Sequence, residues 1–364
     1  MNLLYFIDGG FNNGVGSLFV EQAKAIHKQY KNIYVVTSSK EQEPNLIQSV
    51  KDDGISVICL DGLETHKNYN VHIKQLLDYI IKNNIQIVHV QSNWQLAIVT
   101  RVKFHLLFKQ KLKIVYTIHS YRNNHPFKAV FARIMISLIL FLFVDNIICT
   151  SKFLKKKFRI LSYKIKLLPL GVSNSFFEEY NECKTDSLRL VFPAQFRIGK
   201  NQDVLIEAFT EYVEKSNDRK SVLYLLGNGE LFNQAKEMVQ RLDMGKQIFL
   251  PGRCRISDIK QYYKDSNIAV ISSSSETFGY CIVEPFVLGR SVITRHVGIA
   301  DDIIKDGVSG FFFNNKSELV NILIEISKNK DNLKMMGENN YKQRERFSWD
   351  IITAQYLKCL CVKY

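Results

Sequence analysis

The sequence predicts an α/β protein built from two doubly wound, parallel-sheet domains that face one another across a central cleft. Three observations support this class. Short apolar segments alternate with segments of helical periodicity, this alternation runs in two successive series, and a polar segment separates the two series. Alternating strands and helices indicate parallel strands joined by helical crossovers. At 364 residues and 46% apolar content, the chain is long enough for two such cores.

The first domain is expected over residues 1–172. Only five apolar residues precede Asp8, and no basic segment comes before them, so the start of the chain predicts a strand and no signal peptide. The expected elements, in order, are the strand 3–7, the helix 16–30, the strands 33–37 and 56–60, the helix 70–82, the strands 85–90 and 114–118, the helix 127–143, and the strands 146–150 and 167–170.

The most apolar stretch of the chain is residues 129–149. Arg133 interrupts it early and Asp145 late, whereas a membrane span needs about 20 uninterrupted apolar residues. A buried or surface-docking helix over 127–143 is therefore expected, and contact with one leaflet of a membrane remains an alternative.

The second domain is expected over residues 173–346, beginning with a polar linker at 173–185. A last helix at 348–362, within the segment 347–364, is expected to cross back to the first domain. The elements expected between them are the strand 188–193, the helix 201–215, the strand 221–227, the helix 230–242, the strand 248–250, the helix 256–264, the strand 268–271, the helix 281–288 and the strand 291–294.

The net charge of +14 lies almost entirely in the first half of the chain: residues 1–171 carry +13 and residues 172–364 carry +1. Residues 101–171 alone hold 15 basic residues and one acidic residue, which suits an anionic membrane surface. Nucleic acid is the competing partner, but no nucleic-acid-binding signature accompanies the charge, so none is expected. The basic residues proposed for the membrane patch are Lys152, Lys155, Lys156, Lys157 and Arg159.

The seven cysteines are scattered and form no CxxC pair. This pattern is typical of a reducing compartment and excludes a zinc-finger or disulfide framework. With the basic patch, it predicts a cytoplasmic protein that associates peripherally with the inner face of the cytoplasmic membrane.

Glu276 and Glu284 are the most informative pair of residues. They flank the junction between the apolar strand 268–271, a loop, and a helix that Gly289 ends. In a parallel sheet this junction opens into the ligand crevice, and the following helix N-terminus offers N–H groups to an anion. Since carboxylates repel phosphate, the two glutamates should face the hydroxyl groups of a ribose or hexose. The alternative is a favourable helix-dipole contact for Glu284 and a solvated Glu276. The backbone donors expected at the turn are Phe278, Gly279 and Tyr280.

A glycine-rich turn over residues 8–16 follows the first strand. Gly14 and Gly16 would let the backbone approach a ligand closely. The spacing departs from the dinucleotide-binding fingerprint, so a plain surface turn is an equal alternative.

His119 ends the strand 114–118, where a histidine can donate to a sugar hydroxyl or to a backbone oxygen. A lone histidine is more often structural, and that alternative stays open for His119. His89, in the preceding strand, is interpreted as structural.

Arg197 and Lys200 lie on the short loop after the first strand of the second domain, a suitable place for cations that hold a diphosphate. Surface solvation is the alternative for both. Gly227, after the next strand, adds a second loop where backbone can approach a ligand.

Glu276 and Glu284 form an E-x7-E motif, and several other segments fit one family pattern in the same order. These segments are Gly14–Gly16, Val115–His119, Asp145–Ser151, Pro169–Val172, Lys200–Ala208, Leu226–Glu230, Val297–Gly298, Asp306–Gly310 and Phe347–Trp349. Together they resemble the GT-B glycosyltransferases, specifically the retaining family 4 enzymes (glycosyl transferases group 1), over essentially the whole chain.

The resemblance implies a nucleotide-sugar donor, transfer with retention, no cofactor and no obligatory metal. It assigns Lys200 to the diphosphate, Glu284 to the ribose, Glu276 to the donor sugar, and backbone around Phe278 to the sugar and phosphates. It places His119 beside the transferred sugar, so that Glu276 and His119 are the expected catalytic residues.

Four positions depart from the family pattern; two of them are Ile299 and Asp302, which replace a glycine and a glutamate after Val297–Gly298. Gln195 stands where an arginine is common, so Arg197 replaces that arginine or Lys200 holds the phosphate alone. Thr277 replaces a glycine.

The expected activity is transfer of a hexose, from a UDP-sugar in preference to a GDP-sugar, to a glycan acceptor that is lipid-linked. The expected pathway is the biosynthesis of a cell-surface polysaccharide: O-antigen, capsule or exopolysaccharide. A nucleotide-sugar epimerase of the same architecture is the alternative.

Overall fold

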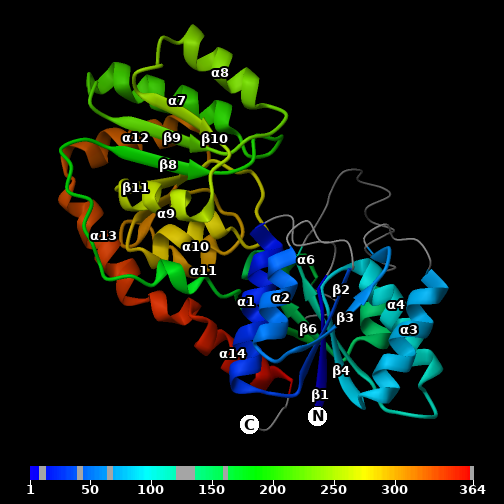
Figure 1. Ribbon diagram of the computed structural model, residues 1–364. Helices are drawn as coiled ribbons and strands as arrows, with labels where there is room; N and C mark the ends of the chain where they lie inside the picture. Colours follow the sequence, from blue (N-terminus) through cyan, green and yellow to red (C-terminus); the bar gives the residue numbers. More distant parts are fainter. Residues whose placement is uncertain (8–13, 39–43, 64–68, 120–135, 159–162, 361–364) are drawn as a thin grey trace. The chain divides into compact units, whose positions relative to one another are not determined.

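The computed structural model describes residues 1–364 except 8–13, 39–43, 64–68, 120–135, 159–162 and 361–364 (Figure 1). The chain separates into two compact units. Unit 1 comprises Met1–Ser173 and Ser348–Tyr364, and unit 2 comprises Asn174–Phe347.

Unit 1 is built on a seven-stranded parallel sheet of order β3-β2-β1-β4-β5-β6-β7. From β1 the chain winds toward β3, and from β4 it winds the other way, which makes the sheet doubly wound. The strands are β1 (Asn2–Phe6), β2 (Ile33–Ser38), β3 (Ser56–Leu60), β4 (Ile85–Val90), β5 (Lys113–Ile118), β6 (Asn146–Cys149) and β7 (Ile165–Leu167).

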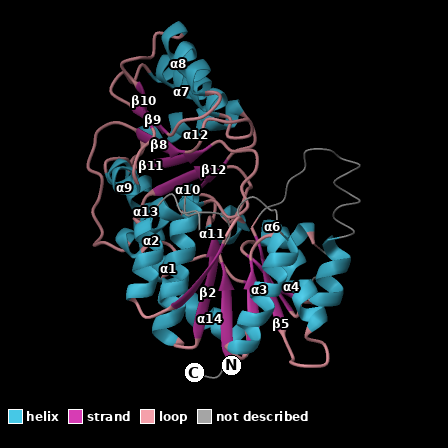
Figure 2. Cartoon of the chain, turned by 45° about the vertical axis from the view of Figure 1, so that its right-hand side comes forward, coloured by secondary structure: helices cyan, strands magenta, loops and turns pink. Residues whose placement is uncertain are grey.

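Helices cover both faces of this sheet. Right-handed crossovers place helices that follow opposite winding directions on opposite faces, and Figure 2 shows α3 and α4 on one side of the strands and α1 and α2 on the other. The helices of unit 1 are α1 (Gly14–Gln29), α2 (Pro44–Asp52), α3 (Tyr69–Lys82), α4 (Asn93–His105), the helical residues 136–143, α6 (Lys152–Lys157) and α14 (Trp349–Cys359).

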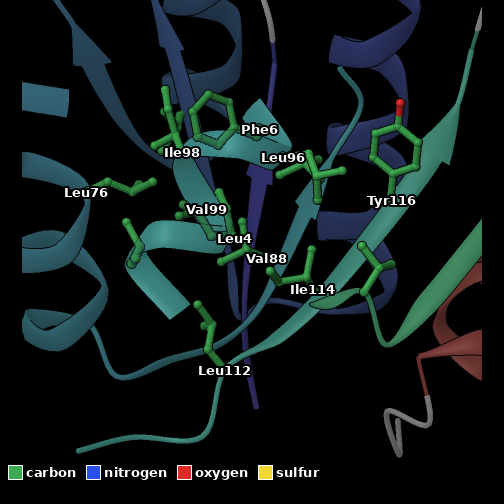
Figure 3. Packing of buried hydrophobic residues seen from close by; sticks show 14 of the residues in the cluster. Leu4, Phe6, Leu76, Val88, Leu96, Ile98, Val99, Leu112, Ile114 and Tyr116 are labelled. Carbon is green, nitrogen blue, oxygen red and sulfur yellow. The ribbon is translucent and has the colours of Figure 1, made fainter. Parts of the chain in front are cut away.

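Each face carries its own apolar core. On the α3 and α4 face, Leu76 and Val99 pack with Phe6 and Ile114 of the strands (Figure 3). On the other face, residues of α1, α2 and α14 pack together around alternate strand positions. Because both faces are buried, these strands read as nearly continuous apolar runs in the sequence.

The C-terminal helix α14 is part of unit 1. Trp349 lies against Gly171, where a Cβ atom would come within 2.4 Å of the indole ring, and its Nε1 donates to Glu21 at 2.9 Å. Deeper in the core, the Tyr356 hydroxyl and His89 Nδ1 are 2.9 Å apart, and His89 Nε2 lies 2.7 Å from Thr117 Oγ1. His89 thus has partners at both ring nitrogens and joins α14 to the sheet.

Unit 2 has a six-stranded parallel sheet of order β10-β9-β8-β11-β12-β13. Its strands are β8 (Arg189–Pro193), β9 (Val222–Leu226), β10 (Ile248–Gly252), β11 (Ile268–Ile271), β12 (Ser291–Thr294) and β13 (Gly310–Phe312). Its helices are η3 (Asn174–Phe176), α7 (Gln202–Ser216), α8 (Phe232–Arg241), α9 (Ile256–Lys264), α10 (Tyr280–Val287), α11 (Ala300–Ile303), α12 (Lys316–Lys328), α13 (Asp331–Lys342) and η4 (Arg344–Phe347).

The predicted strand at 167–170 is wrong, because β7 begins at Ile165 and ends at Leu167. Pro169 has no N–H to donate to a neighbouring strand. The strand therefore ends before Pro169, although the apolar sequence continues to Leu170. The structure also contains α-helices that were not predicted: α2, α4, α6, α11, α12 and α13. Of the helix expected at 127–143, the described residues 136–143 are helical.

Within the part of the chain that the structure describes, no helix combines the length and apolar character needed to cross a bilayer.

Replacing Tyr356 by phenylalanine tests the attachment of α14. The substitution leaves Nδ1 of the buried His89 without this partner, which should lower the free energy of unfolding by about 1–3 kcal/mol. The measurement is urea denaturation. Gln355→Ala, a change at an exposed position of the same helix, is the control and should alter the free energy by less than about 0.5 kcal/mol. Equal effects of both substitutions would contradict the anchoring role.

Candidate functional site

The candidate site in unit 2 lies at the carboxyl ends of β8 and β11. These strands are neighbours in the sheet, but the chain winds from β8 toward β10 in one direction and from β11 toward β13 in the other. The loops after the two strands therefore diverge at a topological switch point, where open α/β sheets bind their ligands.

Hydrogen bonds join the loop after β8 to the loop after β11. Ser272 Oγ donates to the Lys200 carbonyl at 2.8 Å, and Asn201 Nδ2 donates to the Ser272 carbonyl at 3.1 Å. The Ser274 backbone N–H donates to the Gly199 carbonyl at 2.9 Å. These contacts fix the position of one loop relative to the other.

Lys200 and Glu276 meet between these two loops. Lys200 Nζ lies 2.5 Å from Glu276 Oε1, and the two side chains are only 11% and 12% exposed. Poor access to water strengthens their attraction and makes either charge costly without the other. The structure thus places Lys200, which was predicted to bind the diphosphate, in direct contact with Glu276, which was predicted to bind the donor sugar.

The turn before α10 depends on glycine. Gly279 has φ +92° at the N-cap of α10. Gly298, with φ +55°, packs so closely that a Cβ atom would lie 2.3 Å from the Phe278 carbonyl oxygen. That oxygen accepts a hydrogen bond from the Ile299 N–H at 2.8 Å. The turn lies at the N-terminus of α10, where the helix dipole and backbone N–H groups favour an anion. Tyr280 is the first residue of α10.

Glu284 lies one turn further along α10. The Tyr263 hydroxyl donates to its Oε2 at 3.3 Å. Although the side chain is partly exposed, the protein atoms packed around the carboxyl raise its pKa to about 8 by desolvation. At neutral pH the carboxyl therefore carries a proton and can both donate to and accept from a pair of hydroxyl groups.

The other predicted residues of unit 2 lie nearby, in the loops after β8 and β9. Gly227 has φ +132°, and a Cβ atom there would lie 2.1 Å from the Ala194 carbonyl oxygen. Only glycine fits at position 227, because the loop after β9 packs closely against the loop after β8. Arg197 is exposed on the loop after β8.

In unit 1, His119 follows β5. Its Nε2 lies 2.8 Å from Gln91 Oε1, and Gln91 Nε2 donates to the Phe6 carbonyl at 3.4 Å, which orients the amide. The carbonyl oxygen of Gln91 can only accept, so His119 Nε2 carries the hydrogen, and Nδ1 carries a lone pair that none of the described residues binds. Burial lowers the pKa of His119 to about 4, so the ring is neutral near pH 7.

Gly14 and Gly16 lie in the first turn of α1, and the preceding residues 8–13 lie outside the described residues. The basic side chains Lys152, Lys155, Lys156 and Lys157 belong to α6, whose N-cap is Ser151. Lys152, Lys156 and Lys157 are exposed. Arg159 lies outside the described residues.

The sequence reasoning missed a histidine–aspartate pair after β12. His296 Nδ1 lies 2.6 Å from Asp301 Oδ1, and the ring stacks on Phe312 with a centroid distance of 4.1 Å. His296 lies in the loop after β12 and Asp301 in α11, on either side of Ile299, whose N–H donates to the Phe278 carbonyl. His119 was selected because ligand-binding residues lie just after the carboxyl ends of parallel strands. The same strand-end rule would have selected His296, which stands two residues beyond β12.

Two family models match the chain. The model described as Glycosyltransferase Family 4 matches residues 12–176, and the model described as Glycosyl transferases group 1 matches residues 175–343. Together they cover nearly the whole sequence.

Individual relatives agree with these models. An uncharacterized glycosyltransferase of Methanocaldococcus jannaschii is 26% identical over 338 residues, which cover 84% of this chain and 89% of that protein. The alpha-monoglucosyldiacylglycerol synthase of Streptococcus pneumoniae is 23% identical over 66% of this chain and 58% of its own length. The Anabaena protein Alr3699/HepE, solved with UDP, superposes with a TM-score of 0.80 at 16% identity, covering 99% of this chain and 100% of that chain.

The fold and the matching models define a nucleotide-sugar-dependent glycosyltransferase of the GT-B class. The chain belongs to glycosyltransferase family 4, as the ordered motifs indicated, and the predictions of a GT-B fold and of a hexosyltransferase enzyme are confirmed.

The raised pKa of Glu284 should make stability depend on pH. Between pH 4.5, its ordinary value, and about pH 8, the folded state keeps a proton that the unfolded state releases. The free energy of unfolding should therefore fall over this window by at most about 1.4 kcal/mol per pH unit. Below the window the carboxyl is protonated in both states, and above it the carboxyl is ionised in both. Urea denaturation of wild type and Glu284→Gln across this range checks the expectation, since the variant should lose this part of the slope; identical slopes would contradict it.

His119 should remain a neutral ring with its hydrogen on Nε2 down to about pH 5. The reason is that burial disfavours the imidazolium and holds the pKa near 4. Nitrogen chemical shifts from NMR distinguish the two tautomers and the charged form. The His119→Asn variant identifies the signal. A protonated Nδ1 at pH 7 would show that the Gln91 contact is not as described.

Proposed function

We propose that this glycosyltransferase moves a hexose from a UDP-sugar to a lipid-linked glycan acceptor, with retention of anomeric configuration, in the biosynthesis of a cell-surface polysaccharide (O-antigen, capsule or exopolysaccharide). The observation that carries the proposal is the Lys200–Glu276 pair beside the N-terminus of α10. Relatives support the substrates: Alr3699/HepE was solved with UDP and with UDP-glucose, and one relative is named for making a glucosylated lipid.

Lys200 and the N–H groups at Gly279 and Tyr280 are proposed to hold the diphosphate. When the bond from the sugar C1 to the phosphate oxygen breaks, its electron pair leaves with UDP and negative charge grows on that oxygen. Fixed cations and helix N-termini stabilise such charge most effectively in a site with little water. We propose that this charge compensation needs neither a metal ion nor a cofactor.

Retention follows from the proposed order of bonds. The acceptor oxygen forms its bond to C1 on the face that the diphosphate leaves, and its proton passes to the departing phosphate oxygen. No carboxylate nucleophile is assigned, because Glu276 is paired with Lys200 and reads the sugar hydroxyls. Glu284 reads the ribose hydroxyls, and His119 accepts a hydrogen bond from the transferred sugar at Nδ1.

We further propose that the enzyme works in the cytoplasm at the inner face of the membrane. The basic patch of Lys152, Lys155, Lys156, Lys157 and Arg159 supports this proposal, since each cation near an anionic surface contributes about 1 kcal/mol. Nucleic acid is not proposed as a partner.

Incubation of the purified protein with UDP-hexoses and GDP-hexoses, with and without a lipid-linked acceptor, tests the activity. Glycosylated lipid with the anomeric configuration of the donor is the expected product, identified by NMR. An epimerised free donor with no transfer would contradict the proposal and favour an epimerase.

Lys200→Ala should lower kcat/KM for the donor by about 10²–10³-fold, because it removes a cation from the oxygen where charge develops. It should also weaken UDP binding, measured by calorimetry. Lys215→Ala is the matched control: Lys215 lies in α7, forms an exposed pair with Glu211, and should leave both values unchanged. If Lys200→Ala bound UDP as tightly as wild type does, the proposal that Lys200 holds the diphosphate would be wrong.

A further inference from the structure

Residues 79–177 form the most one-sided charged segment of the chain. They contain sixteen lysines and arginines but a single acidic residue, Asp145. That carboxylate is already engaged: its Oδ2 lies 2.8 Å from Lys103 Nζ and accepts from the Ile114 N–H at 2.8 Å. The remaining positive charge of the segment has no acidic counterpart within it.

The topology gathers part of this segment at one edge of unit 1. Helices α3, α4 and 136–143 run antiparallel to the strands that follow them, so their C-terminal ends lie where β4, β5 and β6 begin. Two lysines tie these ends together. Lys103 Nζ donates to the Phe143 carbonyl at 3.0 Å, and Lys164 donates to the Phe141 and Val144 carbonyls.

Large apolar side chains are exposed at the same edge. Phe108 is fully exposed, and Phe104 and Leu107 are more than half exposed. On the neighbouring helix end, Leu142 is also more than half exposed, and Phe141 nearly so. Tyr163, 67% exposed, lies against the Phe141 ring at a centroid distance of 6.3 Å. We call these six residues the amino-edge surface: Phe104, Leu107, Phe108, Phe141, Leu142 and Tyr163.

Lysines are interleaved with these apolar residues. Lys109 and Lys111 directly follow Phe108 and are exposed, and Lys164 Nζ lies 5.2 Å from the centre of the Phe141 ring. Lysine is depleted at the cores of protein–protein interfaces. It is favoured at lipid interfaces, where its stem covers apolar surface and its charge reaches the headgroups.

We propose that the amino-edge surface docks on an anionic lipid bilayer, with its aromatic and leucine side chains inserted among the headgroups. A second copy of this surface would bring its interleaved lysines against one another, because a two-fold interface is self-complementary. The proposal deepens the membrane location proposed above and rests on it. It adds an apolar contribution to membrane binding, from the amino-edge residues, which the charge pattern alone did not identify.

The test is binding of the full chain to vesicles of equal phosphatidylglycerol and phosphatidylcholine. Wild type should bind them and retain part of that binding at about 0.5 M salt, where charge attraction is largely screened. Leu107→Gln/Phe108→Gln should lower the partition coefficient at least tenfold and abolish the binding that resists salt. Val71→Gln is the matched control, since Val71 is 54% exposed at the opposite end of α3, and should change the coefficient less than twofold.

Two further measurements keep the outcome decisive. Lys109→Gln/Lys111→Gln should weaken binding at low salt only, and Phe108→Trp should add a fluorescence signal that shifts to the blue on vesicles.

UDP binding, measured on each variant, separates this proposal from the proposed function: lost vesicle binding with intact UDP binding supports docking. Wild type that ignores the vesicles, or a double variant that binds them as wild type does, would overturn it. A double variant that dissociates a dimer without changing vesicle binding would assign the surface to a second copy.

Discussion

The ion pair between Lys200 and Glu276 is the constraint on which the proposed donor site depends. Both side chains are nearly buried, so each charge is tolerated because the other is present. The pair can form because β8 and β11 are neighbours whose following loops start side by side. Serine and asparagine contacts between those loops then hold the two side chains at the switch point. The order of the strands places the two loops side by side, and the packing of the loops in turn places Lys200 beside Glu276.

Two histidines of unit 1 differ in how many of their ring nitrogens have partners among the described residues. Burial lowers the pKa of both, to about 3 for His89 and about 4 for His119, so both are neutral near pH 7. His89 has hydrogen-bond partners on both nitrogens, from β5 and α14. His119 has Gln91 at Nε2 and no partner for Nδ1 among the described residues. The sequence shows only that each histidine follows an apolar run.

The sequence predicted the fold better than it predicted contacts. Strands buried on both faces are continuous apolar runs, so β11 and β12 were predicted with their exact bounds. At 167–170 the same rule failed, because it considers only apolar character and ignores that Pro169 has no N–H to donate to a neighbouring strand. The strand-end rule brought Lys200, Glu276 and Glu284 to one place. It did not reveal the ion pair or the Tyr263 contact, since these join residues 76 and 21 positions apart.

Because Lys200 is already neutralised by Glu276, donor binding has to redistribute charge inside the site. In the proposed site, a diphosphate would compete for Lys200, and as the lysine turned to it the Glu276 carboxylate would become free to accept hydrogen bonds from the sugar. A free hexose carries no charge with which to compete, and it would meet a carboxylate that is already satisfied. Under the proposed roles, recognition of the sugar is therefore conditional on recognition of the diphosphate. Such coupling gives selectivity for the activated sugar without any additional residue, because one buried pair links the two halves of the donor.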